Sequence, residues 1–205
     1  MNFSELSNAR RSVRGFKSLP IPDEVVTDML NAAVQSPSGG NRQPWHFYVI
    51  SDSDTIRQIR EKAYPADWFS TAPVLFVVCV DAERSGAKYG DRGRELYCIQ
   101  DTGAAIQSML LCAKSHGLDT CWCGAFDEGA VAEVLDIPAN LRPVALIPTG
   151  YGNNDNKKPN RRPMAEVVTF IGGNSIISAE NSEISDSDIS GMKINGVEIE
   201  KLIKE

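Results

Sequence analysis

The stretch from Asp101 to His116 constrains the fold more than any other part of this sequence. Small and apolar residues occupy every side of the helix that it predicts, charge is almost absent, and Gly117 follows as a C-terminal cap. Such a helix needs burial nearly all round. Its small residues also permit another helix to approach closely, from the same chain or from a second subunit.

The run from Pro73 to Val80 is apolar throughout, which predicts a strand at the centre of a sheet. Amphipathic or capped segments predict shorter helices, and β-branched runs between turn formers predict further strands. Because the two element types mix without regular βαβ repetition, we expect a sheet flanked by helices. The predicted segments are helices over Asp23–Gln35 and Asp127–Leu135 and strands over His46–Ile50, Val144–Ile147 and Glu166–Phe170.

The length of 205 residues suits one sizeable core with an appendage. The net charge of −6 argues against general affinity for nucleic acid, which clustered Lys and Arg bind, so any anion site must be local. No apolar run is long enough to span a bilayer, and the first residues lack a basic region followed by an apolar stretch. We expect a cytoplasmic protein with no membrane partner.

The cysteines number five, an odd count, and most of them lie in apolar surroundings. Buried thiols in a reducing compartment fit this pattern better than a disulfide framework. Only one pair is close in sequence, and the two histidines fall in unrelated segments, so buried thiols are favoured over a zinc or iron–sulfur site. The cysteines are Cys79, Cys98, Cys112, Cys121 and Cys123.

The character of the chain changes at Gly172. A stretch rich in Ser, Asp and Glu follows as far as Ser190, which indicates a linker. Beyond it, Asn195-Gly196 lies between alternating residues and predicts a hairpin. An isolated hairpin is marginal in water, so this tail should dock on the main body or on a partner chain. The predicted organisation is one globular domain over 1–171 and an appendage over 172–205.

Two basic clusters stand out in this acidic chain. The first is Arg10-Arg11-Ser12-Val13-Arg14, whose guanidinium groups and hydroxyl suit contact with phosphate. The second is Lys157-Lys158-Pro159-Asn160-Arg161-Arg162-Pro163, far away in sequence. Taken alone, the first cluster fits a solvated surface turn better than a phosphate anchor, because charge runs are common on surfaces. Together the two suggest convergence on one phosphate, with a basic surface patch as the alternative.

Two further segments have backbones suited to a ligand. The loop Ser36–Trp45 contains two glycines that let its backbone approach a ligand, beside Ser, Asn and Gln side chains. A plain helix-to-strand connection, with Trp45 in the core, is the alternative. The segment Cys121–Asp127 precedes a helix, and Gly124 there allows peptide N–H groups to point at a bound ring.

Dinucleotide fingerprints, Walker loops, HExxH motifs and nucleophile elbows are missing from the sequence. Taken together, the four segments resemble the nitroreductase family, the FMN-dependent, homodimeric oxidoreductases. The resemblance covers about residues 4–171 and is carried by RRSVRGF, SPSGGNRQPWHFYVI, DTCWCGAFDEGAVAEVLDIP and VALIPTGYGNNDNKKPNRRPMAEVV. It implies an α+β fold with a central, mainly antiparallel sheet flanked by helices, and an obligate homodimer with FMN at the subunit interface.

The resemblance also implies which residues bind the cofactor. The N-terminal pattern matches Arg10, Ser12 and Arg14, and Arg11 contributes a backbone amide. The loop that the other subunit lays against the flavin matches Pro37, Ser38, Gly39 and Asn41. The stretch whose backbone approaches flavin N5 matches Cys123 and Gly124, just after Cys121. Some relatives carry an acidic residue where this chain has Cys123. The FMN phosphate is reached by Arg161, with Arg162 as a second cation.

In such a family the flavin carries the chemistry, so no catalytic side chain is expected. The implied activity is hydride transfer from NADH or NADPH to a small electrophilic acceptor, such as a nitroaromatic or a quinone, in a ping-pong cycle. Two alternatives remain open. The same scaffold also suits reductive dehalogenation or flavin degradation, and a flavin-binding sensor or storage module would use the tail to cover the ring.

Overall fold

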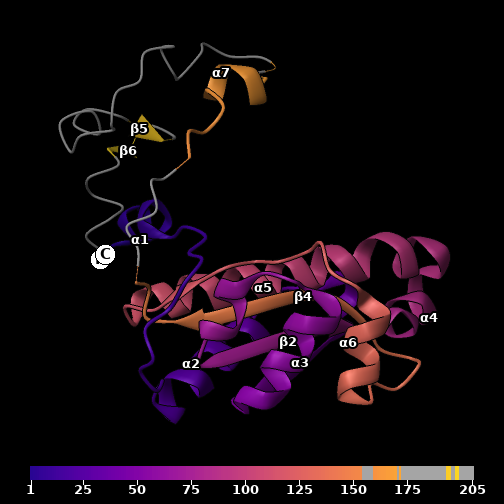
Figure 1. Ribbon diagram of the computed structural model, residues 1–205. Helices are drawn as coiled ribbons and strands as arrows, with labels where there is room; N and C mark the ends of the chain where they lie inside the picture. The colour runs from indigo at the N-terminus through magenta and orange to yellow at the C-terminus, as the bar shows by residue number, and fades with distance from the viewer. Residues whose placement is uncertain (154–158, 170, 172–192, 195–196, 199–205) are drawn as a thin grey trace. The chain divides into compact units, whose positions relative to one another are not determined.

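The computed structural model describes residues 1–153, 159–169, 171, 193–194 and 197–198 (Figure 1). The chain divides into two compact units, Met1–Lys158 and Pro159–Glu205. The first unit contains the sheet and the long helices. The domain boundary after residue 171 stays a prediction, and the linker expected after Gly172 lies outside the described residues.

A four-stranded sheet forms the centre of the first unit. Its strand order is β1-β2-β4-β3, and every neighbouring pair is antiparallel. β2 is an interior strand and all of its residues are buried, as the apolar run predicts. The α+β fold with a mainly antiparallel sheet is therefore confirmed. The strands are β1 Trp45–Ile50, β2 Val74–Val80, β3 Asp119–Thr120 and β4 Arg142–Gly150.

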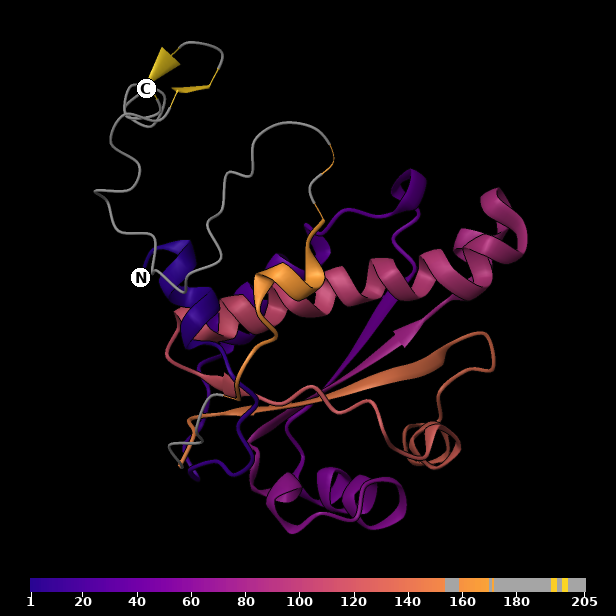
Figure 2. The same cartoon turned by 90° about the horizontal axis from the view of Figure 1, so that it is seen from above.

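Helices cover both faces of this sheet, and Figure 2 shows α5 and α3 on opposite sides of it. Alternate residues of β2 serve the two faces, because Phe76 packs in the core beside α2 and α5, whereas Val77 packs beside α3 and α6. The helices are α1 Phe3–Ala9, α2 Asp23–Val34, α3 Ser53–Ala63, α4 Ala82–Arg92, α5 Cys98–Ser115 and α6 Glu128–Leu135. Shorter turns are 3₁₀-helical at Gly39–Asn41 and Asp67–Thr71 and π-helical at Gly93–Tyr97.

Local caps explain where the predicted helices begin and end. The Asp127 carboxylate accepts the Ala130 N–H at 2.9 Å and starts α6 where the sequence predicts it. Gly117 follows α5 with a φ of 76°, a left-handed conformation that favours glycine. Helix α5 begins three residues earlier than predicted, at Cys98.

The burial of α5 differs from the expectation of burial nearly all round. One face is buried in the core, with Ala105, Met109 and Ala113 fully covered. On the other face Ile99 is 40% exposed and Gln107 is exposed, while Gly103 is partly covered. A single chain therefore leaves this face of a charge-poor helix without full cover.

The second unit contains a short helix where the sequence predicts a strand. The expected strand over Glu166–Phe170 is wrong, since Met164–Val167 forms the helix α7. Pro163 precedes this turn with a suitable φ, and the Val168 N–H closes it on the Met164 carbonyl at 2.9 Å. The β-branched residues of this segment favour a strand, but a strand forms only when a partner strand pairs with it. The predicted hairpin strands are paired antiparallel as β5 Lys193–Ile194 and β6 Val197–Glu198.

Candidate functional site

The N-terminal basic segment lies against the short edge strand β3. Ser12 and Thr120 form a parallel bridge, and the Val13 N–H donates to the Thr120 carbonyl at 2.9 Å. Side chains alternate along this extended segment, because Val13 is 2% exposed whereas Ser12 and Arg14 are exposed. Ser12 and Arg14 of the predicted anchor are thus exposed residues of one edge, and the Ser12 hydroxyl also hydrogen-bonds the Cys121 thiol.

The two other arginines of this segment follow α1 directly. The Arg10 N–H donates to the Leu6 carbonyl at 3.0 Å and closes the helix. Arg10 and Arg11 are both partly buried. The structure therefore places all four predicted residues of the first segment in one short stretch between α1 and the sheet.

The segment after β3 continues along β4, and alternate backbone N–H groups of this segment bond to β4. The Cys121 N–H donates to the Pro148 carbonyl at 3.2 Å, and Cys123 exchanges two backbone hydrogen bonds with Leu146, both at 2.9 Å. No hydrogen bond among the described residues uses the Gly124 N–H. A Cβ at Gly124 would meet no atom within 4 Å. An exposed glycine with an unused backbone donor therefore follows directly after the two cysteines.

The two thiols of this segment point into the core. Cys121 and Cys123 are 2% and 4% exposed. The hydrogen bond with Cys123 lowers the pKa of Cys121 to about 7 against the effect of burial, with help from Arg14 and Ser12. The same pairing raises the pKa of Cys123. Burial first, and then Cys123, raises the pKa of Tyr64 to about 12. The pair therefore favours a thiolate on Cys121 and a retained proton on Cys123.

The loop after α2 is anchored on α5. The Gly39 N–H donates to Asp101 Oδ1 at 3.0 Å, and the hydroxyls of Ser36 and Ser108 lie 2.8 Å apart. Asp101 is 9% exposed, and its second oxygen, Oδ2, is buried without a hydrogen-bond partner in the described part of the chain. Gly40 has a φ of 56°, which favours glycine. The loop is thus tied to a buried carboxylate.

The predicted residues of this loop differ in exposure. Pro37 and Asn41 are exposed, whereas Ser38 and Gly39 are partly buried. Gln43 braces the loop internally, because its N–H donates to Ser38 Oγ and its side-chain amide donates to Asn41 Oδ1, both at 3.0 Å. Pro37 and Asn41 therefore lie on the outer side of a braced turn.

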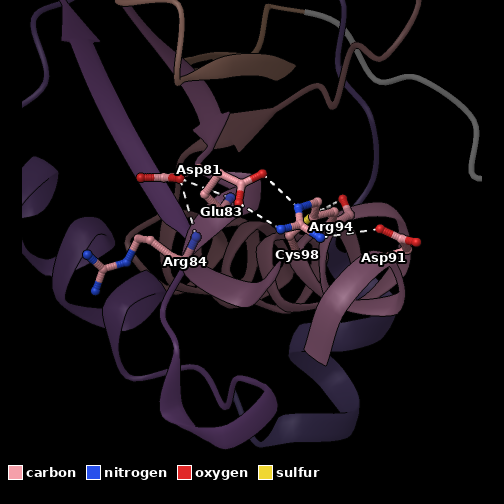
Figure 3. A network of polar contacts seen from close by, with 6 residues as sticks. All are labelled: Asp81, Glu83, Arg84, Asp91, Arg94 and Cys98. Atoms are coloured by element: carbon pink, nitrogen blue, oxygen red, sulfur yellow. Dashed lines mark hydrogen bonds and ion pairs between the residues drawn. The ribbon is translucent and has the colours of Figure 1, made fainter. Parts of the chain in front are cut away.

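Helix α4 and the π-helical turn form a platform beside this loop, and Figure 3 shows the polar contacts that join them. Arg94 binds Glu83 through two nitrogens, at 2.7 and 3.0 Å, and contacts Asp91 at 3.3 Å. A Cβ at Gly93 would lie 2.4 Å from the Ser85 carbonyl oxygen. Only glycine therefore lets the turn pass this close to α4.

Further contacts connect the platform to the loop. Asp81 caps α4 by accepting two N–H bonds from its first turn, and the Cys98 thiol donates to the Arg94 carbonyl at 2.8 Å (Figure 3). Arg42 and Arg84 exchange hydrogen bonds, since the Nε of each donates to the carbonyl of the other, at 2.5 and 3.1 Å. Side-chain donors and backbone carbonyls from both parts thereby join the loop to the platform.

The structure brings together two of the four predicted segments within one unit, residues 10–14 and 119–124 at the β3 edge. The loop over residues 36–43 is bonded instead to α4 and α5. Hydrogen bonds hold each part in place, but the two parts are built from different elements.

Arg161 and Arg162 belong to the second unit. The Arg161 guanidinium donates to the Pro159 carbonyl at 3.0 Å, and Arg162 pairs with Glu166 at 3.2 Å. Their convergence with the N-terminal arginines on one phosphate stays a prediction.

Sequence reasoning did not single out Asp101 and Tyr64. Asp101 carried a signal, because it is the one acidic residue in the helix Cys98–Ser115, and a buried charge needs a partner. Tyr64 carried none, since its hydrogen bond with Cys123 arises only when distant segments pack together.

The described residues contain no group of three or more His, Cys, Asp or Glu side chains placed to hold a metal ion. Among the helices of the described part, none has the length and apolar character needed to cross a bilayer.

The model of the nitroreductase family matches residues 8–66 and 60–151, which is more than half of the sequence. The chain belongs to the nitroreductase family. It is therefore an enzyme of the oxidoreductase class, in agreement with the resemblance that the four segments carry.

Individual relatives cover most of this nitroreductase family member. A protein of Archaeoglobus fulgidus, provisionally named NADH dehydrogenase/NAD(P)H nitroreductase, is 31% identical over 150 residues, or 71% of this chain and 83% of that protein. A 4-nitrobenzoate reductase of a Nocardioides species is 30% identical across 82% of this chain and 90% of its own length. The crystal structure of a nitroreductase family protein from Clostridium difficile has a TM-score of 0.73 and 30% identity, covering 83% of this chain and 98% of that one.

Proposed function

We propose that this chain is a homodimeric oxidoreductase that holds FMN at the β3 edge and passes hydride from NADH or NADPH to a small electrophile, such as a nitroaromatic or a quinone. The unused N–H of the exposed residue Gly124, whose Cβ side is open, carries this proposal. Exposed Ser12 and Arg14 lie on the segment bridged to the same strand. When bound, FMN supplies the hydride chemistry itself.

The residues of the edge divide the binding between backbone and charge. With FMN bound, the Gly124 N–H would donate to the ring and fix its orientation, and Arg10 of the edge together with Arg161 of the second unit would bind the phosphate. Arg14 lies close enough to lower the pKa of the Cys121 thiol, so its positive charge acts within this edge. A fixed cation there stabilises negative charge on a reduced flavin and raises the midpoint potential.

The incomplete cover of α5 supports a homodimer. Its outer face carries Ile99, 40% exposed, beside the small residue Gly103, and the edge strand β1 carries Val49, 43% exposed. A second copy would cover such surfaces and bring its own Pro37–Asn41 loop to the flavin. Sedimentation equilibrium tests this directly, because a monomer at micromolar concentration would contradict the proposal.

Amide hydrogen exchange tests the Gly124 donor. We expect the Gly124 N–H to exchange rapidly without FMN and to be protected when FMN is added, because it then gains its acceptor. The Cys123 N–H is the internal control, since it is already bonded to Leu146 at 2.9 Å and should change little. A Gly124 amide that is equally exposed with and without FMN would remove this assignment.

The phosphate anchor has its own test. Arg10→Ala and Arg161→Ala should each weaken FMN binding by roughly 10- to 100-fold, because each removes charge-assisted hydrogen bonds. Arg57→Ala is the matched control, as Arg57 is an exposed arginine paired with Asp54 on α3. If both anchor variants purify with full flavin occupancy, the assignment is wrong.

Steady-state kinetics test the reaction sequence. Reduced nicotinamide and acceptor should use one open face in turn, so double-reciprocal plots at several acceptor concentrations should be parallel. Intersecting lines would show that both substrates are bound at once and would exclude the shared face.

A further inference from the structure

A compact cluster of two tyrosines and two cations, which we call the tyrosine–cation cluster, lies on α4 and the π-helical turn. The rings of Tyr89 and Tyr97 meet edge to face, with centroids 5.1 Å apart and planes at 77°. Lys88 Nζ lies 5.3 Å from the centre of the Tyr89 ring, and the Arg92 guanidinium carbon lies 5.3 Å from the centre of the Tyr97 ring. Arg92 Nε also donates to the Tyr97 hydroxyl at 3.0 Å.

This cluster touches the loop that the proposed function assigns to the flavin. A Cβ at Gly39 would lie 3.5 Å from the Tyr97 ring. At Gly40 it would lie 2.5 Å from the Tyr89 hydroxyl and 2.7 Å from Lys88 Nζ. Any larger residue at Gly40 would displace these groups, so the glycine backbone is what keeps the loop and the cluster in contact.

The two cations of the cluster form no salt bridge within the described residues, although Asp101 Oδ2 lies beside the same rings. Lys88 and Arg92 are exposed, and neither takes part in a salt bridge there. The nearest acidic residue in sequence, Asp91, is paired with Arg94 at 3.3 Å. Two cations therefore lie beside two aromatic rings on a chain whose net charge is −6. This combination suits a ligand that carries both an aromatic ring and an anionic group.

We propose that the tyrosine–cation cluster selects, for the oxidoreductase reaction, acceptors that combine an aromatic ring with a carboxylate. This inference rests on the proposed function, because the Gly39–Gly40 loop brings the cluster to the flavin of the second subunit. Tyr89 and Tyr97 provide edges and faces for the acceptor ring, and Lys88 and Arg92 bind its carboxylate. These four are specificity-determining residues, and the hydride transfer itself is left to the flavin.

The experiment compares two acceptors of the same size on the FMN-loaded, full-length enzyme. The acceptors are 4-nitrobenzoate, which is anionic, and 4-nitrobenzamide, which is neutral. The measured quantity is the KM for 4-nitrobenzoate divided by the KM for 4-nitrobenzamide. The double variant Lys88→Gln, Arg92→Gln should raise this ratio about tenfold, because it removes charge-assisted bonds to the carboxylate alone. The single variant Arg92→Lys, in which Lys88 is unchanged and both positive charges are kept, should retain most of the preference for the anionic acceptor.

The control is Lys62→Gln. Lys62 is an exposed cation on α3, paired with Glu133, and its removal should leave the ratio unchanged. An unchanged ratio in the double variant, or an equal rise of KM for both acceptors, would overturn the inference. A change confined to the discrimination between NADPH and NADH would also overturn it, because it would assign the cations to the dinucleotide.

Flavin content separates this inference from the proposed function. A wild-type chain that binds no FMN would overturn both. Yellow, active variants with an unchanged ratio would overturn only the selection of acidic acceptors.

Discussion

The two halves of the candidate site are built in different ways. The edge half, residues 10–14 and 119–124, is aligned by backbone hydrogen bonds with β4 and β3. The loop half, residues 36–43, is held by side chains of α4 and α5 and by glycines that fit closely against them. Backbone pairing does not depend on side-chain identity, whereas a side-chain anchor is lost with one substitution. The two halves should therefore respond differently to mutation.

The comparison also separates two kinds of chemistry. The edge half offers peptide N–H groups and a buried thiol pair, which suit the proposed roles of orienting a ring and setting the local charge. The tyrosine–cation cluster beside the loop half offers rings and exposed cations, which suit recognition of another molecule. A cofactor that stays bound suits the first half, and a substrate that is exchanged in every cycle suits the second.

Gly93→Ala should break the loop half most strongly. A methyl group there would lie 2.4 Å from the Ser85 carbonyl oxygen, so α4 and the π-helical turn must separate. We expect the free energy of unfolding to fall by about 3 kcal/mol, measured by urea denaturation. Amide exchange should accelerate at Gly39 more than at Val13 or Cys123.

Gly129→Ala is the control for this substitution. The added Cβ would lie 3.4 Å from Asp127 Oδ1 on an exposed part of α6, so stability should change by less than about 1 kcal/mol. Equal acceleration of exchange in both halves by Gly93→Ala would contradict the separation between them.

The pH dependence of stability should report on the edge half. Because the folded pKa of Cys121 is lowered from 9.0 to about 7, its contribution is complete above pH 9 and is lost as the pH falls through 7. Unfolding experiments should show stability rising by roughly 2 kcal/mol between these values. Above pH 9 the raised pKa values of Cys123 and Cys79 act in the opposite direction.

Cys121→Ser should remove the rise between pH 7 and pH 9 without altering exchange at Gly39. If the wild-type stability is flat across this range, the thiol pair does not share a proton in the way that the structure indicates.

Asp101→Ala should loosen the loop half by removing the acceptor of the Gly39 N–H, which lies 3.0 Å from Oδ1. The expected loss is about 1.5 kcal/mol, since a buried donor is left without its partner. Asp101→Asn keeps an acceptor oxygen and should retain most of the stability. Equal losses in both variants would show that the negative charge, rather than this hydrogen bond, holds the loop.

The smallest effect concerns the one ion pair that fastens β3 to α5. Lys114 and Asp119 lie 2.8 Å apart with side chains 21% and 18% exposed. Lys114→Met should cost about 1 kcal/mol, whereas Lys62→Met, at a pair that is 49% and 72% exposed, should cost less than about 0.5 kcal/mol. Similar costs at the two sites would mean that the edge half has no side-chain anchor of its own.

Sequence alone was sufficient where the signal was local. The apolar run of β2 predicted a central strand, and the Asp127 cap placed the start of α6, because burial and capping depend on neighbours in the chain. The four quoted segments were sufficient to assign the family. The predicted strand over Glu166–Phe170 failed because β-branched residues favour a strand only when a partner strand is available.

Only the tertiary structure decided which residues meet. The sequence gives no sign that Thr120 receives the Val13 N–H, that Tyr64 lies beside Cys123, or that Gly93 must pass within contact distance of Ser85. The first two contacts join segments that are distant in the chain, and the third depends on how the π-helical turn folds back on α4, so their free energy exists only after these elements have packed. Composition and periodicity thus determined the elements of this protein, while packing determined its site.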